Sequence, residues 1–200
     1  MILRSIYLLG IASLIIFTPK TTYLIPNELA KIFSLVLFNI LFYISLIDIK
    51  SLIISSLALK IGFLAGFTMF LLNINYLEFN STIRLFFDLL FSSTCSFLII
   101  FFVNQIGESL TGENLVGIGD AKLASMCALW IGGRGVFSSL LLAFFAAGTF
   151  SFCRLFTKKV KRFEPIPFAP FISGGVWCIW ITGSNWWWIK LQDLFGYLMV

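Results

Sequence analysis

Apolar residues follow one another along this chain in long blocks, and short polar stretches separate the blocks. The blocks lie near residues 5–19, 32–48, 52–72, 85–106, 120–132, 135–157, 168–183 and 186–199. Several of them approach the ~20 residues that an α-helix needs to cross ~30 Å of hydrocarbon. The pattern therefore predicts an all-α fold, a polytopic transmembrane helix bundle of about six to eight helices. A single domain over residues 1–200 is expected.

Three blocks have features that bear on how they sit in a membrane. The block at 120–132 is too short to span comfortably, so we expect it to be tilted or flanked by thinner bilayer. The block at 5–19 is similar to a secretion signal, but residues 18–20 offer no small-residue cleavage site, so a retained first helix is expected. Three tryptophans at 186–188 are typical of an aromatic belt at the outer interface.

Composition narrows the class of protein. With 60% hydrophobic and only 12% charged residues, the chain is predicted to be an integral membrane protein in contact with lipid, and no nucleic-acid partner is expected. The four cysteines lie in apolar blocks without CxxC spacing, as expected of small core residues. The chain has no histidine, which excludes Ser–His and Cys–His nucleophiles and histidine-ligated metals. Acid–base chemistry must then use carboxylates or lysine, and no metal or cofactor is predicted.

Basic residues in the short loops indicate an orientation. Four of them gather in the loop at 158–162, which the positive-inside rule places in the cytoplasm. When the blocks are counted back from this loop, Asp120 and Asp48 both fall at the cytoplasmic ends of helices. The two aspartates are therefore predicted to face the same compartment.

Each of these aspartates has an ordinary structural interpretation when it is considered alone. Asp120 follows a glycine turn and precedes an apolar run, a pattern typical of a helix N-cap, and Asp48 is typical of a polar helix end. As a pair at matching depth, they could converge on one water molecule. Two close carboxylates do not both ionise easily, so one retains its proton. The ionised one could then act as general base on water while the other polarises a peptide carbonyl.

The residues next to Asp120 could support this chemistry. Gly117 and Gly119 permit close approach of backbone or substrate and could aim the carboxylate. Lys122 has several interpretations that the sequence leaves open. It could favour the charged form of Asp120, contact a carboxylate of a substrate, or extend to the cytoplasmic interface.

Three segments together resemble one known family. Residues 117–123 read GIGDAKL, residues 166–171 read IPFAPF, and residues 47–50 read IDIK. In this order they resemble the GxGD-x-KL signature, the IPFGPF segment and the first catalytic aspartate of type IV prepilin peptidases, which are bacterial membrane aspartic proteases. The resemblance covers roughly residues 40–185. Ser55, Ala128 and Ala169 depart from the family, which often has Pro at the first of these positions and Gly at the other two.

The resemblance implies a function and a set of site residues. It implies an aspartic endopeptidase of the inner membrane, with Asp48 and Asp120 catalytic at the cytoplasmic face. The enzyme would remove the short basic leader from type IV prepilins or pseudopilins and serve a pilus or secretion machinery. Many members carry an additional cytoplasmic segment with paired CxxC motifs, associated with N-methyltransferase activity. The chain resembles the short form without this segment, so methylation is not expected.

Further residues are candidates for binding the substrate. Glu108 and Glu113 lie on the predicted cytoplasmic side and could attract a basic leader, although ordinary solvated loop charges are the simpler interpretation. Pro167, Phe168 and Pro170 of the IPFAPF segment are the remaining candidates.

Two alternatives stay open at this stage. Another GxGD-type intramembrane protease would carry Tyr-Asp and PAL motifs, which this chain lacks. A transporter could use acids such as Asp88 and the intramembrane Lys60 as an ion path, which would spread these charges through the depth of the membrane. We expect Asp88 to pair with Arg84 one turn earlier, and Lys60 to lie ~12 Å deep with a partner that the sequence does not identify.

Overall fold

The computed structural model describes residues 2–16, 26–111, 117–156 and 166–198, and this part of the chain is built of helices without strands. The helices are α1 Ile2–Ile16, α2 Asn27–Ser51, α3 Ser56–Ile74, α4 Phe79–Thr111, α5 Ile118–Phe156, α6 Ala169–Thr182 and α7 Ser184–Leu198. Four of them, α2 to α5, are long and apolar enough to cross a membrane. The prediction of an all-α membrane bundle of six to eight helices is thus confirmed.

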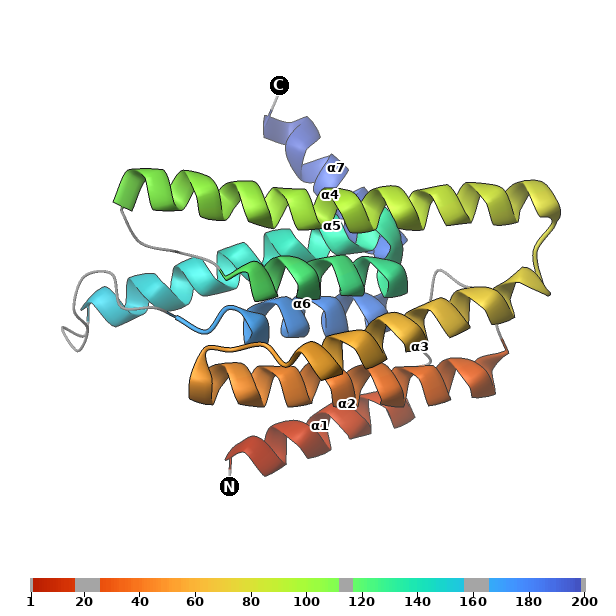
Figure 1. Ribbon diagram of the computed structural model, residues 1–200, viewed down its shortest axis with the longest axis horizontal. Helices are drawn as coiled ribbons and strands as arrows, with labels where there is room; N and C mark the ends of the chain where they lie inside the picture. Colours follow the sequence, from red (N-terminus) through yellow and green to blue (C-terminus); the bar gives the residue numbers. More distant parts are fainter. Residues whose placement is uncertain (1, 17–25, 112–116, 157–165, 199–200) are drawn as a thin grey trace.

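Helix α5 is interrupted at Gly132, where the chain reverses direction. Gly132 has φ 68° and ψ 178°, a conformation that glycine adopts without a steric penalty. The first arm of α5, residues 118–131, therefore runs one way along the molecule and the second arm, residues 133–156, returns beside it (Figure 1). These two arms correspond to the separate apolar blocks predicted at 120–132 and 135–157.

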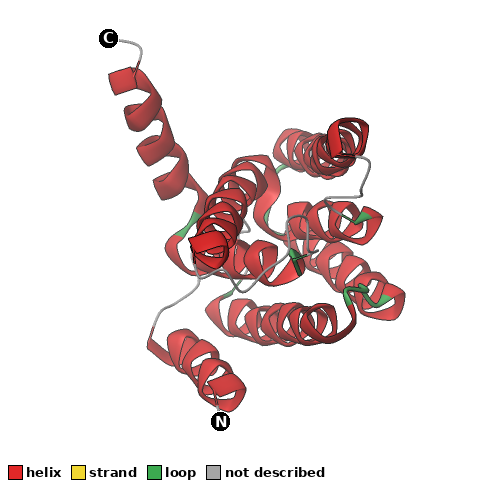
Figure 2. Ribbon diagram, turned by 90° about the vertical axis from the view of Figure 1, so that its left-hand side faces the viewer, coloured by secondary structure: helices red, strands yellow, loops and turns green. Residues whose placement is uncertain are grey.

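The long helices lie side by side along the longest axis of the molecule, whereas α7 leaves the bundle at an angle (Figures 1 and 2). One end of the bundle holds the α2–α3 connection and the beginnings of α5 and α6, and we call it the Asp48 end. The opposite end holds the α3–α4 connection, the turn at Gly132 and the α6–α7 connection, and we call it the Gly132 end. Figure 2 looks at the Asp48 end.

The first arm of α5 forms the centre of the bundle. Seven of its residues have no exposed surface: Ala121, Leu123, Ala124, Met126, Cys127, Ala128 and Trp130. Glycines of α3 let the two helices approach closely, because a Cβ atom at Gly62 would overlap the sulfur of Met126. The indole N–H of Trp130 also donates a hydrogen bond to the Gly62 carbonyl at 3.1 Å. Protein surrounds this short arm, so the tilt or thinner bilayer predicted from its length is not required.

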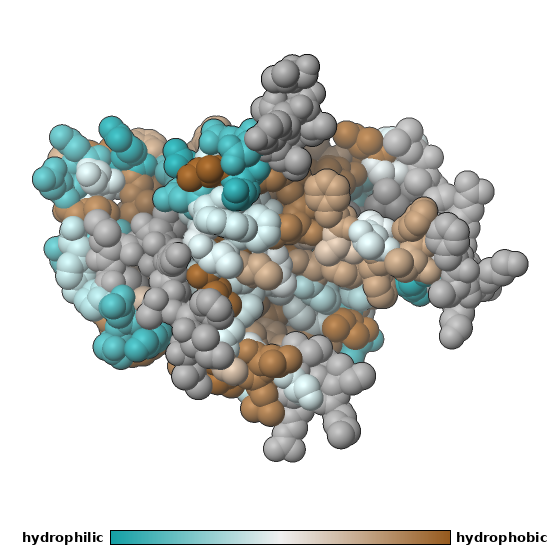
Figure 3. Space-filling view, turned by 180° about the vertical axis from the view of Figure 1, so that it is seen from behind, coloured by the Kyte–Doolittle hydropathy of each residue, from teal (hydrophilic) through white to brown (hydrophobic). Residues whose placement is uncertain are grey.

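The outside of the bundle is apolar, as expected for contact with lipid. Large side chains such as Phe79, Phe91 and Phe145 have more than two thirds of their surface exposed, at 78%, 72% and 73%. Figure 3 shows brown apolar surface across the middle of one face, with the teal hydrophilic residues gathered mainly at the left, toward the Gly132 end. This distribution agrees with a helical membrane protein.

Candidate active site

Asp48 lies in the last turn of α2 and its carboxylate reaches the beginning of α6. The Oδ2 atom accepts a hydrogen bond from the backbone N–H of Ala169 at 3.0 Å, and only 4% of Asp48 is exposed. Ala169 is the first residue of α6, whose early N–H groups have no partner within the helix. Pro170 in the same turn has no N–H to satisfy. The buried carboxylate therefore caps α6, and the positive end of the α6 dipole points at Asp48.

Asp120 is held by the turn that precedes α5. Its Oδ2 atom accepts a hydrogen bond from the Gly117 N–H at 3.1 Å, and its own N–H donates to the Gly117 carbonyl at 3.0 Å. The helix begins at Ile118, so Asp120 is its third residue and reaches back to the preceding residue, as in a capping box. The prediction that Asp120 itself is the N-cap is wrong, because Gly117 holds that position. The glycine turn fixes the carboxylate through this reciprocal pair of bonds.

The two carboxylates line the same cavity at the Asp48 end, with a volume of about 430 Å³. Asp48 comes from α2 and Asp120 from the first arm of α5, and the α2–α3 connection and the start of α6 complete the walls. The two carboxyl groups interact electrostatically across this space. The Oδ1 atom of Asp120 is buried and, among the residues that the structure describes, has no hydrogen-bond partner. The site thus holds one carboxylate oxygen that is not engaged by the protein.

The two glycines of the turn have different roles. A Cβ atom at Gly119 would lie 3.1 Å from the Cβ atom of Ile54 in the α2–α3 connection, so only glycine allows this approach without a shift. A Cβ atom at Gly117 would lie 3.5 Å from Asp120 Oδ2, which is an ordinary contact. Gly119 therefore brings the α5 turn against the cavity wall, whereas Gly117 contributes its backbone N–H.

Two other predicted site residues also line the cavity. Lys122 is exposed at its edge, one turn from the beginning of α5. Phe168 is buried and packs against Phe144 of the second α5 arm, with ring centroids 5.2 Å apart. The structure therefore brings Lys122 and Phe168 together with the two aspartates.

The remaining predicted residues lie elsewhere. Pro167 and Pro170 flank Phe168 and are not among the residues that line the cavity. Glu108 is exposed near the end of α4 and is also outside the cavity wall. Glu113 lies outside the described residues. The IPFAPF segment therefore contributes the side chains of Ile166 and Phe168 to the cavity wall and the Ala169 N–H to Asp48, and its prolines lie next to these residues in the chain.

Sequence reasoning missed the apolar wall of the cavity. Leu52, Ile53, Ile54 and Leu59 line it next to Asp48. Leu52 adopts a left-handed conformation with φ 54° and donates its N–H to the Asp48 carbonyl at 2.8 Å, which ends α2. These residues belong to the apolar run predicted as the third helix. Their hydropathy does not distinguish the residues of the α2–α3 connection from those of α3 itself. Ser55 is the one sequence signal for the boundary between the connection and α3, since serine is a common N-cap and Ser55 caps α3.

Two predictions about the other charged residues are wrong. Lys60 was expected ~12 Å deep in its helix. However, α3 begins at Ser56, so Lys60 is its fifth residue and is exposed. Asp88 was expected to pair with Arg84, but no such ion pair forms between these described residues. The Asp88 carboxylate instead accepts a hydrogen bond from the Gly133 N–H at 3.5 Å, at the Gly132 end.

The fold and this site define a class, that of polytopic helical membrane proteins in which two buried carboxylates share one cavity. Comparison with known sequences then gives the family. Residues 35–152 match the type IV leader peptidase family, and the chain belongs to it. The matched range includes both aspartates, and the family resemblance predicted from the sequence is confirmed. The alternatives of another GxGD-type protease or a transporter are not favoured.

Individual relatives agree with the family match. A prepilin leader peptidase/N-methyltransferase of Xanthomonas campestris pv. campestris is 30% identical over 78 residues, which cover 39% of this chain and 27% of the relative. Proteins with the same name from Aeromonas salmonicida and Pseudomonas aeruginosa are 24% and 26% identical over 98 residues, or 49% of this chain and 34% of each relative. The matched part thus spans about a third of these relatives or less. No solved structure is significantly similar.

Proposed function

We propose that this protein is a membrane aspartic endopeptidase that removes the short basic leader from type IV prepilins or pseudopilins. One observation carries the proposal: the buried carboxylates of Asp48 and Asp120, from two different helices, line one cavity at one end of the bundle. The match to the type IV leader peptidase family supports it. N-methyltransferase activity is not part of the proposal, and we treat residues 1–200 as one peptidase domain.

The mechanism uses one proton shared between the two carboxyl groups. The ionised carboxylate takes a proton from a water molecule, whose oxygen attacks the carbonyl carbon of the scissile peptide bond. The protonated carboxyl group donates its proton to the carbonyl oxygen, which gives a tetrahedral intermediate. The first carboxyl group then returns its proton to the leaving nitrogen as the C–N bond breaks, and the second recovers its proton from the hydroxyl group. No net proton is consumed by the pair.

The contacts of each carboxylate suit this cycle. Oδ2 of Asp48 and Oδ2 of Asp120 are each held by one backbone N–H, which fixes both groups in orientation. Oδ1 of Asp120 has no such bond to the described residues, so we assign it to the water or to the substrate carbonyl. Fixed, buried groups of this kind need little reorganisation during the reaction.

The walls of the cavity suit a substrate that is apolar on one side of the cut. Leu52, Ile53 and Leu59 could contact the apolar helix that follows the scissile bond. Glu108, exposed at the same end of the bundle, could attract the basic leader. We place this end at the cytoplasmic face of the bacterial inner membrane, following the positive charges of the loop at 158–162. Pilus or secretion assembly machinery would then receive the product.

The test is co-expression with a pilin-like precursor and measurement of leader removal on a gel. Asp48→Asn and Asp120→Asn are the test variants. Asp88→Asn is the matched control, since Asp88 is an aspartate of α4 at the opposite end of the bundle, beside Gly133. Wild-type protein and the Asp88→Asn variant should cleave, and the other two should not. If folded and inserted Asp48→Asn and Asp120→Asn variants cleave at the normal rate, the assignment of the pair is wrong. If the wild type cleaves no such precursor, the proposed substrate class is wrong.

A further inference from the structure

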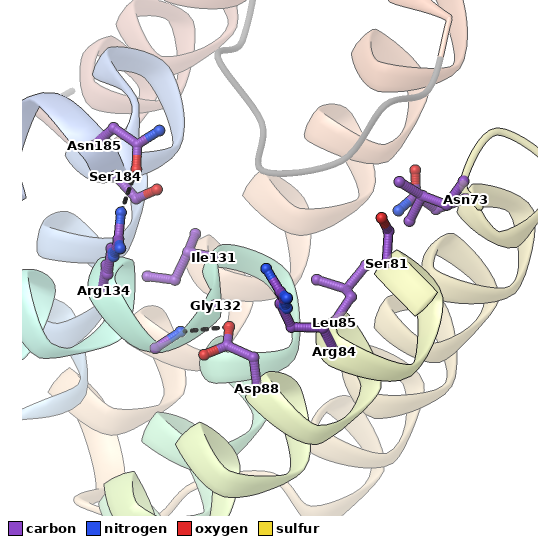
Figure 4. A pocket seen from close by; sticks show the side chains of 12 residues that line it. Asn73, Ser81, Arg84, Leu85, Asp88, Ile131, Gly132, Arg134, Ser184 and Asn185 are labelled. Carbon is purple, nitrogen blue, oxygen red and sulfur yellow. Dashed lines mark hydrogen bonds between the residues drawn. The ribbon is translucent and has the colours of Figure 1, made fainter. Parts of the chain in front are cut away.

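A second cavity, of about 380 Å³, lies at the Gly132 end, far from the paired aspartates (Figure 4). Two arginines line it: Arg84 from the beginning of α4 and Arg134 from the turn of α5. In Figure 4 both side chains extend toward the same side of the turn, and Asp88 lies between them. Ser184 and Asn185 at the beginning of α7 add polar groups to the wall. The proposed peptidase mechanism does not use this cavity.

The Gly-Gly-Arg-Gly turn holds Arg134 in a defined place. A Cβ atom at Gly133 would lie 3.3 Å from Asp88 Oδ1, and one at Gly135 would lie 2.8 Å from the Cβ atom of Ile131. Gly133 thus lets the turn pack closely against α4, and Gly135 lets it close against Ile131 of the first α5 arm. Arg134 is the only residue of this tetrapeptide with a side chain, and its Nη1 atom donates to Asn185 Oδ1 at 3.4 Å. The guanidinium is therefore tied to the wall of the cavity.

Among the residues that the structure describes, the charges that line this cavity do not cancel. Two guanidinium groups face one carboxylate, that of Asp88, which leaves one net positive charge. Asp88 is also bonded to the Gly133 N–H, so it has a structural contact in the turn. A group with a single negative charge, such as a phosphodiester, would neutralise the site. Arginine suits this ligand because its planar donors match phosphate oxygens.

An apolar groove of about 310 Å³ lies next to this cavity. It shares Asp88, Gly133 and Arg134 with the polar cavity and is lined further on by apolar side chains of α4, α5 and α7. These include Phe91, Ile99, Phe137, Leu140 and Trp188. From Asp88 to Ile99 the groove follows α4 for about 16 Å, roughly half of the hydrocarbon thickness. Its length therefore corresponds to one leaflet.

We propose that the two spaces together bind one anionic phospholipid whose headgroup carries a single phosphodiester charge, such as phosphatidylglycerol. The phosphate contacts Arg84 and Arg134, the polar wall of α7 faces the rest of the headgroup, and an acyl chain occupies the groove. Trp188 borders the groove, and tryptophan is enriched at the depth where lipid headgroups meet the hydrocarbon. A soluble anion would use only the polar cavity, so the adjoining apolar groove favours a lipid.

The test compares lipids that bind to the detergent-purified full-length protein. Native mass spectrometry should show that the wild type retains phosphatidylglycerol in preference to phosphatidylcholine with the same acyl chains. Arg84→Gln and Arg134→Gln should each weaken this retention about tenfold, because each removes a charge-assisted hydrogen bond to the phosphate. Lys190→Gln is the matched control: Lys190 is an exposed cation on α7 that lines neither space.

A second set of measurements separates the lipid from a soluble anion. Ile99→Trp should fill the exposed groove and weaken phosphatidylglycerol retention while both arginines remain. Millimolar glycerol phosphate should not displace the lipid from the wild type. Equal retention of the two lipids, or an equal loss in Lys190→Gln, would overturn the proposal. Displacement by glycerol phosphate together with a normal Ile99→Trp variant would show an anion site without a lipid. Thermal unfolding in phosphatidylcholine shows whether each variant folds. If Arg134→Gln does not fold, the result for Arg84→Gln alone tests the proposal.

Discussion

The carboxylate of Asp48 accepts a hydrogen bond from the backbone N–H of Ala169, 121 residues later in the chain. This bond joins the end of α2 to the beginning of α6 and gives the IPFAPF segment a definite structural role. The segment presents a backbone donor to a buried acid, and its prolines shape the start of the helix that carries this donor. This structural role explains the two prolines without any direct contact between them and the substrate.

The first prediction separates the structural and chemical roles of Asp48. In Asp48→Asn the amide oxygen can still accept from the Ala169 N–H, so the free energy of unfolding should change little while cleavage falls by about 10²–10⁴-fold. In Asp48→Ala the buried Ala169 N–H loses its hydrogen-bond partner, which should lower the free energy of unfolding by about 1–3 kcal/mol relative to Asp48→Asn. Thermal unfolding in detergent and precursor cleavage measure the two effects. Equal stability of the two variants would show that the bond does not matter to the fold.

The second prediction concerns the turn that carries Asp120. Gly119→Ala places a Cβ atom 3.1 Å from the Ile54 Cβ, so the turn or the cavity wall must shift. Cleavage should fall by about tenfold, since overpacking of this kind costs roughly 1–3 kcal/mol. Gly117→Ala is the matched control, because its Cβ would make only an ordinary contact with Asp120. Its rate should stay within about twofold of the wild type, as for small surface changes.

A double variant checks the physical cause of this effect. Ile54→Ala removes the two outer carbons that crowd Gly119, at 3.3 Å, although its Cβ remains. Combined with Gly119→Ala, it should restore part of the lost rate, giving a favourable coupling between two residues in contact. Additive losses would mean that the glycine acts through backbone freedom and not through packing against Ile54.

The block pattern of the sequence predicted the helices and the reversal of α5, because hydropathy falls at the Gly-Gly-Arg-Gly turn. It could not predict where α3 begins, since Leu52 and Ile53 are as apolar as the helix that follows. That error placed Lys60 too deep. The hydrogen bond between Asp48 and Ala169 could not be predicted from the sequence either. Every residue except proline has a backbone N–H, so the residue type does not identify the donor. The motif pointed to the segment, and only tertiary packing shows which of its atoms meets the acid.

The third prediction tests the reversal of α5. Gly132 has φ 68°, so Gly132→Ala should destabilise the protein by about 1–2 kcal/mol. The control is Gly148→Ala in the second arm of α5, where a Cβ atom meets nothing within 4 Å. Alanine is the better helix former, so this variant should be as stable as the wild type or up to about 1 kcal/mol more stable. Unfolding midpoints in the same detergent give the comparison, and equal destabilisation of both variants would contradict the conformational explanation.

The fourth prediction is the pH dependence of cleavage by the proposed pair. At low pH both carboxyl groups are protonated and no base remains to take the proton from water. At high pH both are ionised and no acid remains to protonate the carbonyl oxygen. The rate should therefore rise and then fall as pH increases, with two apparent pKa values that belong to Asp48 and Asp120 together. Single-turnover cleavage from acid to alkaline pH measures the profile, since product release could otherwise hide the chemical step. Asp88→Asn should preserve both limbs, because Asp88 lies at the opposite end of the bundle and lines a different cavity. A flat profile under single-turnover conditions would be incompatible with acid–base catalysis by two interacting carboxylates.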